Sequence, residues 1–378
     1  MGRYLTIDEV DVNGLNVLVR SDLNVPMEDG EVVDDFRIRA ALPTLETLVS
    51  RGAKVSVCSH LGRPKGIDPF LSMAAVVARM ELLTDLEVGF VDGGQITVLE
   101  NTRFHEGETT NDPDVAAVLA EGIDLFVEDA FGSVHRAHAS TVGVAELVRS
   151  VSGPLLTSEL EALGRFLGEP ESPYSVVLGG AKVSDKLGVI ENLLPRVDRM
   201  LIGGGMCFTF IRAMGGSVGA SLVEESMVQR VDELMHGPDG AKVLLPTDIL
   251  AADSFRADAE TQLVNPGSVP DGWIGLDIGP DSSSAFGKAV VESANVFWNG
   301  PMGVFEWEPF RYGTEAVARA MSECEGFTAV GGGDSAAALR LLGLDTSVSH
   351  MSTGGGAGLE LLEGRVLPGV AVLERWSS

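Results

Sequence analysis

Arginine and histidine residues recur in the polar loops of the amino-terminal half, where each loop adjoins an expected strand or helix. A guanidinium donates two parallel hydrogen bonds from a charge that does not titrate away, which suits phosphate and carboxylate groups. Any one of these arginines alone would most simply be a surface residue paired with a carboxylate. Their repetition instead predicts one cleft for a small molecule with several negative charges. The cationic residues expected there are Arg20, Arg37, His60, Arg63, Arg103 and Arg136.

Asp22 and Asn24 lie in the same loop as the first of these arginines, in the segment RSDLNVP. Their side chains are able to exchange hydrogen bonds with a hydroxyl group of the ligand. Taken alone, both residue types are also typical of an ordinary turn.

The carboxyl-terminal half carries lysine and glycine clusters instead. The segment GGAKVSDK places Lys182 and Lys186, two of the six lysines in the chain, at an expected strand-to-helix junction. A helix amino terminus attracts phosphate, and the two lysines would share one helix face if the helix had already begun. Glycine allows backbone amides to approach a phosphate or a flat base closely, and glycine clusters occur at residues 203–205, 331–333 and 354–356. These features predict a nucleotide site.

Two familiar nucleotide motifs bear on this prediction. The pattern GxxxxGK[ST] does not occur, which excludes a P-loop. GGGDSA, residues 331–336, fits the dinucleotide pattern GxGxxA and raises an NAD-linked dehydrogenase as an alternative. Its position near the end of the chain, without a βαβ unit and an acidic residue at the expected distance, argues against that alternative. The segment from Trp298 to Glu308 favours an adenosine pocket in which the carboxylate of Glu306 accepts ribose hydroxyls.

Short runs rich in β-branched residues alternate with amphipathic stretches along the whole chain. This alternation predicts an α/β fold with parallel sheets flanked by helices on both faces. Ligands of such sheets bind at the carboxyl ends of the strands, where the polar and glycine-rich loops are found. The expected strands are LNVLVR from Leu15, KVSVCSH from Lys54, QITVLEN from Gln95, LFVED from Leu125, YSVVLGG from Tyr174, RMLIGGG from Arg199, KVLLPTD from Lys242, NVFWNG from Asn295 and FTAVGGG from Phe327.

The change from arginine-containing to glycine-rich loops predicts two domains with different ligands. Residues 153–170 have turn residues at both ends and a helical period between them, so they are expected to form a connecting helix. We place the boundary near Gly153, with one domain over residues 1–153 and the other over 154–378, joined by this helix and a hinge.

Composition limits the partners and the compartment. The net charge of −28, from 27 Lys+Arg against 55 Asp+Glu, argues against nucleic acid. A secretory leader and a stretch of roughly 18 apolar residues are both missing from the sequence, so we expect a cytoplasmic protein without a membrane partner. The acidic, lysine-poor composition favours a salt-rich, halophilic cytosol, in which counterions screen the self-repulsion.

From near Arg20 to near Leu373 the chain resembles the phosphoglycerate kinase family. The resemblance rests on nine motifs in order: RSDLNVP, SHLGRP, ENTRFH, DAFGSVHRAHAS, GGAKVSDK, GGGMCFTF, WNGPMGVFEW, GGGDSA and VSHMSTGGGAGLELLEGRVLPG. It implies an enzyme that transfers a phosphoryl group reversibly between 1,3-bisphosphoglycerate and ADP, giving 3-phosphoglycerate and ATP with Mg²⁺, and we expect this enzyme to be a monomer. The first domain would bind the triose and the second the nucleotide, and the last residues would pack back on the first domain.

The resemblance also implies a role for each matching residue. The triose contacts would be Asp22, Asn24, Arg37, His60, Arg63, Arg103 and Arg136. The nucleotide contacts would be Lys186, Gly275, Glu306, Gly332, Gly333, Asp334 and Ser335, with Asp334 as the metal contact. The transferring phosphoryl group would be stabilised by Arg37, Lys182 and the backbone amides of Gly354, Gly355 and Gly356.

Such a transfer needs positioning and charge neutralisation rather than a general base, because the attacking oxygen of ADP or of the carboxylate is already ionised. Closure of the two domains would bring their ligands together and exclude water. The chain looks shorter than the family pattern between Phe70 and Gln95, and this raises a non-catalytic nucleotide-binding relative as a second alternative.

Overall fold

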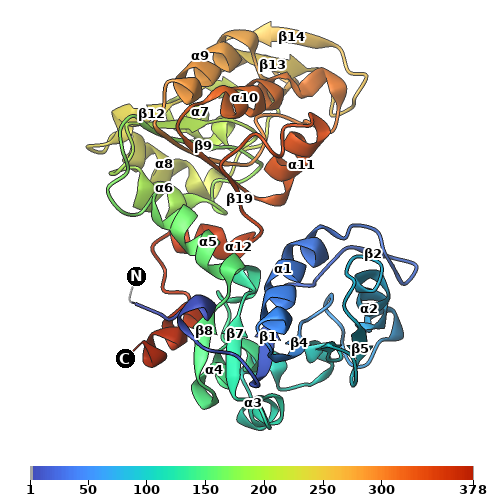
Figure 1. Cartoon of the computed structure of the whole chain (residues 1–378). Helices are drawn as coiled ribbons and strands as arrows, with labels where there is room; N and C mark the ends of the chain where they lie inside the picture. Colours follow the sequence, from blue (N-terminus) through green and yellow to red (C-terminus); the bar gives the residue numbers. More distant parts are fainter. Residues whose placement is uncertain (1–2, 378) are drawn as a thin grey trace. The chain divides into compact units, whose positions relative to one another are not determined.

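The computed structural model describes residues 3–377, which contain two six-stranded sheets (Figure 1). Neighbouring strands within each of these sheets are parallel, and helices flank them. All the strands that the sequence predicts belong to one sheet or the other. The α/β prediction is therefore confirmed.

The first compact unit runs to Glu161 and also contains the chain from Val366 onward. Its sheet has the order β5 (Val88–Phe90), β6 (Ile96–Val98), β4 (Lys54–Cys58), β1 (Asn16–Arg20), β7 (Leu125–Glu128) and β8 (Ser150–Ser152). Its helices are α1 (Phe36–Ser50), α2 (Ala74–Met80), α3 (Pro113–Ala120), α4 (Val144–Leu147) and α13 (Pro368–Ala371), and the short strands β2 (Met27–Glu28) and β3 (Glu31–Val32) form an antiparallel hairpin.

Side chains of β1 alternate between two apolar layers. Val17 and Val19 pack in the layer that contains α1 and α2. Leu18 packs in the other layer with α4 and with Val372. Because both faces of the sheet are covered, its strands are apolar along nearly their whole length, which explains why they could be recognised in the sequence.

The carboxyl-terminal segment packs within this first unit. The amide of Gly369 donates to the carbonyl of Val134 at 2.9 Å, and the indole Nε1 of Trp376 donates to the carbonyl of Ala145 at 2.9 Å. Residues from the two ends of the sequence therefore share one core.

The second unit spans Ala162–Arg365. Its main sheet has the order β12 (Val243–Leu244), β10 (Arg199–Ile202), β9 (Tyr174–Leu178), β17 (Asn295–Asn299), β18 (Phe327–Gly331) and β19 (His350–Met351). Its helices are α6 (Leu187–Leu193), α7 (Cys207–Ala213), α8 (Val228–Met235), α9 (Pro280–Val291), α10 (Tyr312–Glu323), α11 (Gly333–Leu341) and α12 (Gly356–Leu362). Trp298 of β17 is completely buried and packs in the layer formed by α9, α10 and α11.

Smaller sheets in the second unit did not emerge from the sequence. β13 (Ile249–Ala252) pairs antiparallel with β14 (Thr261–Val264) and β16 (Ile274–Ile278), and β11 (Ser217–Val218) pairs with β15 (Ser268–Val269). β14 alternates between exposed and half-buried residues, so it lacks the continuous apolar run of a central strand.

Helix α5 (Pro154–Gly164) contains the division between the two units, which falls between Glu161 and Ala162. The boundary expected near Gly153 lies one residue before this helix begins. Oδ1 of Asp129 accepts the amides of Leu155 and Leu156 at 2.8 and 3.2 Å, so this carboxyl group of the first unit caps the first turn of α5. No helix within residues 3–377 is long and apolar enough to cross a membrane.

Candidate active site

The residues predicted to contact the small-molecule ligand of the first unit lie mostly in loops at the carboxyl ends of its strands. Asp22 and Asn24 follow β1, His60 and Arg63 follow β4, and Arg103 follows β6. Parallel strands end at a common sheet edge, so residues far apart in the sequence are placed close together. The remaining members are Arg136, which follows β7, and Arg37, in the first turn of α1.

Arg37 and Asp22 contact each other directly. Nη1 of Arg37 donates to Oδ2 of Asp22, and the two side chains are 33% and 14% exposed. Asn24 is fixed as well, because its Oδ1 accepts the amide of Gly62 at 2.8 Å. The loop after β1 is therefore tied both to helix α1 and to the loop after β4.

Arg63 and Arg103 line a cavity of about 410 Å³ together with Lys65 and His105. Nη1 of Arg103 donates to the carbonyl of Gly62 at 2.5 Å, which orients the guanidinium from the loop after β4. Arg63 is exposed. The cavity thus has cationic groups on more than one loop, as an anionic ligand requires.

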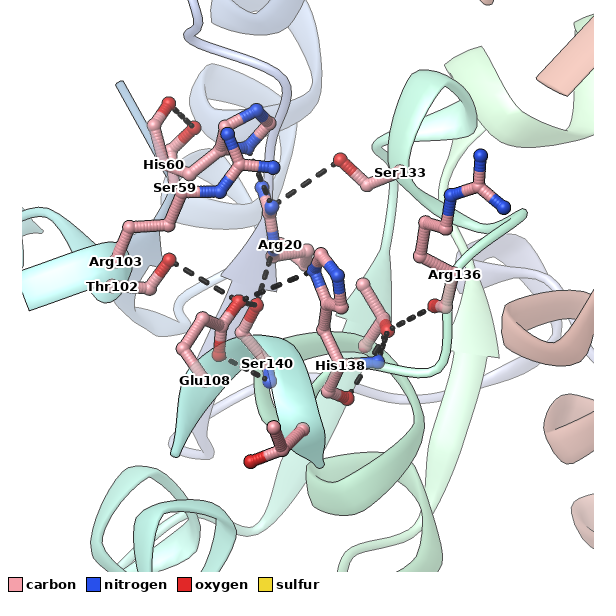
Figure 2. Close-up of polar contacts among 12 residues, drawn as sticks. Arg20, Ser59, His60, Thr102, Arg103, Glu108, Ser133, Arg136, His138 and Ser140 are labelled. Carbon is pink, nitrogen blue, oxygen red and sulfur yellow. Dashed lines mark hydrogen bonds and ion pairs between the residues drawn. The ribbon is translucent and has the colours of Figure 1, made fainter. Parts of the chain in front are cut away.

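The side chain of Arg20 contacts the imidazole ring of His60 (Figure 2). Nη2 of Arg20 lies 3.0 Å from Nδ1 of His60. Burial, together with the positive charges of Arg20 and Arg103, lowers the pKa of His60 to about 2. The imidazole is therefore neutral at physiological pH, so His60 offers a hydrogen-bonding group rather than the cation that the sequence predicted.

Arg20 does not line the cleft, contrary to the sequence-based expectation. Its side chain is completely buried, and it donates to Ser140 Oγ at 2.9 Å, Ser133 Oγ at 3.2 Å and the carbonyl of Ser21 at 2.5 Å. Its position as the last residue of β1, rather than in the following loop, keeps the side chain under the loops. Arg20 therefore connects the loops that carry His60, Ser133 and Ser140.

Arg136 is exposed, and in the view of Figure 2 its guanidinium lies on the opposite side of Ser133 from Arg103 and His60. His60 and Arg103 therefore lie near each other, whereas Arg136 lies apart from them in the loop after β7. His138, two residues further on, lies 3.8 Å from the buried Glu108.

A cavity of about 520 Å³ opens at the glycine-rich loops of the second unit. This volume falls within the range of roughly 300–1,000 Å³ that is usual for small-molecule sites. Of the predicted nucleotide contacts, Gly275, Glu306 and Asp334 line it. Further lining residues that the sequence did not single out as contacts include Gly180, Gly204, Phe208 and Asp277.

The loop after β18 leads into the amino terminus of α11. Gly332 occupies the position before the helix with a φ of +88°, a conformation that favours glycine. Gly333 and Asp334 are exposed in the first turn, where backbone N–H groups lack intrahelical partners and suit a phosphate. Ser335 is buried, and its Oγ accepts the amide of Gly300 at 2.6 Å, so its side chain is committed to the loop after β17.

Lys182 and Lys186 differ in environment. Helix α6 begins at Leu187, after both lysines, so they do not share a helix face. Lys182 is exposed, whereas Lys186 is buried and its Nζ donates to the side-chain oxygen and the carbonyl of Asn299. Burial lowers the pKa of Lys186 to about 8, against the opposing effect of Asp185 and Asp334.

The glycines Gly354 to Gly356 follow β19 and lead into α12. The amide of Gly354 donates to Ser352 Oγ at 3.2 Å, while Gly355 and Gly356 are exposed. This loop belongs to the same unit as Lys182, and Arg37 belongs to the other unit.

Groups of three or more His, Cys, Asp or Glu side chains with metal-site geometry are not found within residues 3–377. Asp334 is one exposed carboxylate at the glycine-rich cavity, which the exposed Glu306 and the buried Asp277 also line. That donor set fits Mg²⁺ held mainly by nucleotide phosphates and water, since this ion commonly takes only one or two protein carboxylates.

The site residues that sequence reasoning missed are mainly supporting ones. Asn299 holds Lys186, and Ser133 and Ser140 hold Arg20. All three occur within motifs that the sequence analysis quoted, but nothing in their residue type indicated which side chain they would contact.

Comparisons with known proteins agree with this architecture. A structure of phosphoglycerate kinase from Coxiella burnetii superimposes with a TM-score of 0.93 at 38% identity and covers 100% of both chains. The fold is therefore that of a two-domain α/β protein.

The phosphoglycerate kinase family profile matches residues 7–365. "Phosphoglycerate kinase" from Parafrankia sp. (strain EAN1pec) is 50% identical, covering 98% of this chain and 99% of the relative. "Phosphoglycerate kinase, cytosolic" from Triticum aestivum is 48% identical and covers 98% of both. The chain belongs to the phosphoglycerate kinase family. The dehydrogenase alternative raised by GGGDSA is accordingly set aside.

Proposed function

We propose that this chain catalyses reversible phosphoryl transfer between 1,3-bisphosphoglycerate and ADP, giving 3-phosphoglycerate and ATP. The observation that supports this most strongly is the combination, in one chain of this family, of cationic loops at the sheet edge of one unit and a glycine-lined cavity at the sheet edge of the other. The first suits a small polyanion and the second a nucleotide.

In the first unit, Arg63, Arg103 and Arg136 would bind the phosphate and carboxylate groups of the triose. His60 would add an uncharged donor. Asp22 and Asn24 would bind its hydroxyl group, and Arg37 would leave its ion pair with Asp22 to meet the transferring phosphoryl group.

In the second unit, Gly275 and Glu306 would contact adenosine, while Lys186 and residues Gly332 to Ser335 would bind the nucleotide phosphates. Mg²⁺, held by those phosphates and by Asp334, would neutralise negative charge on the nucleotide. Ser335 would act through its backbone, because its Oγ already accepts a hydrogen bond from Gly300.

Catalysis would come from donors that surround the equatorial oxygens of the transferring group. Lys182 and the amides of Gly355 and Gly356 would supply such donors from the second unit, joined by the Gly354 amide once it leaves Ser352 Oγ, and Arg37 would supply one from the first. Preorganised donors of this kind stabilise charge in the transition state more than in the substrates. A general base is not needed, since the attacking oxygen is already ionised.

We further propose a monomeric cytoplasmic enzyme that binds neither nucleic acid nor membranes, supported by its net charge of −28 and its composition. The same acidic composition supports function in a salt-rich cytosol. Closure at a hinge near α5 would join the two bound ligands. Activity measured across a range of salt concentrations would test function in a salt-rich cytosol. Light scattering of the purified protein would test the monomeric state.

A coupled assay that follows ATP consumption in the presence of 3-phosphoglycerate and Mg²⁺ tests the activity directly. We expect turnover that requires all three components. A folded protein that binds nucleotide but shows no 3-phosphoglycerate-dependent ATP consumption would support a non-catalytic relative and refute the proposal.

A further inference from the structure

The buried guanidinium of Arg20 makes an unusual set of contacts. Its hydrogen-bond partners are hydroxyl groups, a backbone carbonyl and the His60 ring, all of them neutral groups. Ser140 Oγ accepts from Arg20 Nε and donates to Oε1 of Glu108 at 2.6 Å, so the orientation of this hydroxyl is determined on both sides. The guanidinium is thus fixed at the base of the cationic loops.

The contact between Arg20 and His60 determines which ring nitrogen carries the proton. An arginine side chain has only donors, so Nδ1 of His60 must be the acceptor in the 3.0 Å contact with Arg20 Nη2. In a neutral imidazole the proton then lies on Nε2. Within the described part of the chain, Nε2 of His60 has no hydrogen-bond partner and is not a buried unsatisfied atom. It is therefore an accessible donor.

We propose that Arg20 is a positioning residue, which holds His60 in the Nε2-protonated tautomer so that the ring presents an uncharged N–H donor to the anionic triose. Arg20 cannot make this contact itself, because its side chain is completely buried. The inference deepens the proposed function and rests on the proposed role of His60 as a triose contact.

The tautomer is tested by ¹⁵N NMR of the full chain labelled on its histidine rings, without substrates and at neutral pH. The His60 signals are assigned by their absence in His60→Gln. We expect an unprotonated Nδ1 and a protonated Nε2. Protonation of Nδ1, alone or together with Nε2, would overturn the inference. This readout does not depend on catalysis, so loss of the proposed function and loss of this inference are distinguishable.

Two substitutions of His60 separate the roles of its nitrogens. A glutamine amide places its NH₂ near the position of Nε2, whereas an asparagine amide reaches only the position of Nδ1. We expect His60→Gln to keep most of the affinity for 3-phosphoglycerate and His60→Asn to lose roughly 10- to 100-fold, the effect of one hydrogen bond to a charged group. The reverse order would contradict the inference.

Arg20→Lys tests the positioning residue itself. Lysine retains the charge but cannot reproduce the fork of contacts to His60, Ser133 and Ser140. We expect the KM for 3-phosphoglycerate to rise roughly tenfold or more while the KM for ATP is unchanged. If Arg20→Lys does not fold, the ring spectrum of the wild type and the two His60 variants still test whether Nε2 of His60 carries the proton.

Discussion

Arg37 and Asp22 form an ion pair that links the first turn of helix α1 to the loop after β1. Both residues are proposed to contact the triose, so the arginine charge is compensated until the substrate arrives. The pair is partly exposed, so in the proposed mechanism a substrate phosphate would replace the carboxylate as the partner of the guanidinium.

Arg37→Ala should therefore reduce kcat by about 10²–10³-fold, equivalent to about 2.7–4 kcal/mol for loss of a charge-stabilising donor, and leave nucleotide affinity nearly unchanged. Arg39→Ala is a matched control, since Arg39 lies on the same helix, is 58% exposed and pairs with Asp35. Steady-state kinetics and nucleotide titrations measure the two effects. An unchanged kcat would remove Arg37 from the catalytic set.

Lys182→Ala and Lys186→Ala should differ in kind. We expect the first to lower chiefly kcat, because Lys182 is exposed and free to follow the transferring group, and the second to weaken nucleotide binding. Lys288→Ala, on the exposed face of α9, is the control.

The pKa of Lys186 is about 8, so its positive charge is lost as pH rises through 8. We therefore expect the affinity of the wild type for ADP to weaken over this pH range, and the affinity of Lys186→Met to stay constant. Effects confined to the KM for 3-phosphoglycerate would contradict the assignment.

Asp334→Asn should weaken binding of nucleotide with Mg²⁺ more than binding of nucleotide alone. The amide keeps the size of the side chain but removes the charge that Mg²⁺ favours in an oxygen ligand. Calorimetric titration of ADP with Mg²⁺ and with EDTA gives the ratio of the two affinities. An equal loss in both conditions would indicate that Asp334 does not contact the metal ion.

Glu128→Gln should make stability less dependent on pH. Burial raises the pKa of Glu128 to about 8, against the opposing effect of Arg20. A carboxyl group whose pKa is raised in the folded state stabilises the protein fully below its unfolded pKa of about 4.5 and loses that contribution as pH rises towards 8. Over this range the group makes the free energy of unfolding fall by about 1.4 kcal/mol per pH unit.

The glutamine variant retains the oxygen that accepts the Ala130 amide at 3.0 Å and replaces the Oε2 atom that lacks a partner. Urea unfolding at pH 5 and pH 8 should therefore show a larger advantage for Glu128→Gln at pH 8. The same advantage at both pH values would mean that Glu128 does not change protonation on folding.

Both ligands together should compact the molecule, whereas each alone should do so only slightly. Each ligand is proposed to contact one unit, so only the ternary complex gains contacts from both. Small-angle scattering of the free protein, the two binary complexes and the ternary complex would measure the radius of gyration. An equal decrease with nucleotide alone would show that closure does not need the triose.

The sequence by itself determined the fold class and the motifs that carry the site. Strands such as β1 and β9 are buried on both faces, so their apolar runs are continuous and can be recognised without knowledge of their partners. The loops that follow contain the charged and glycine residues, because ligand sites of parallel sheets form at the carboxyl ends of strands.

Only the tertiary structure decided which of these side chains are exposed in the loops and which are buried beneath them. Arg20 and Arg63 both belong to polar motifs, yet Arg20 is buried by contacts with Ser133 and Ser140, more than a hundred residues away. Lys186 likewise differs from Lys182 because Asn299, at a separation of 113 residues, holds its ammonium group. Burial and pKa depend on such distant neighbours, and local residue patterns do not contain them.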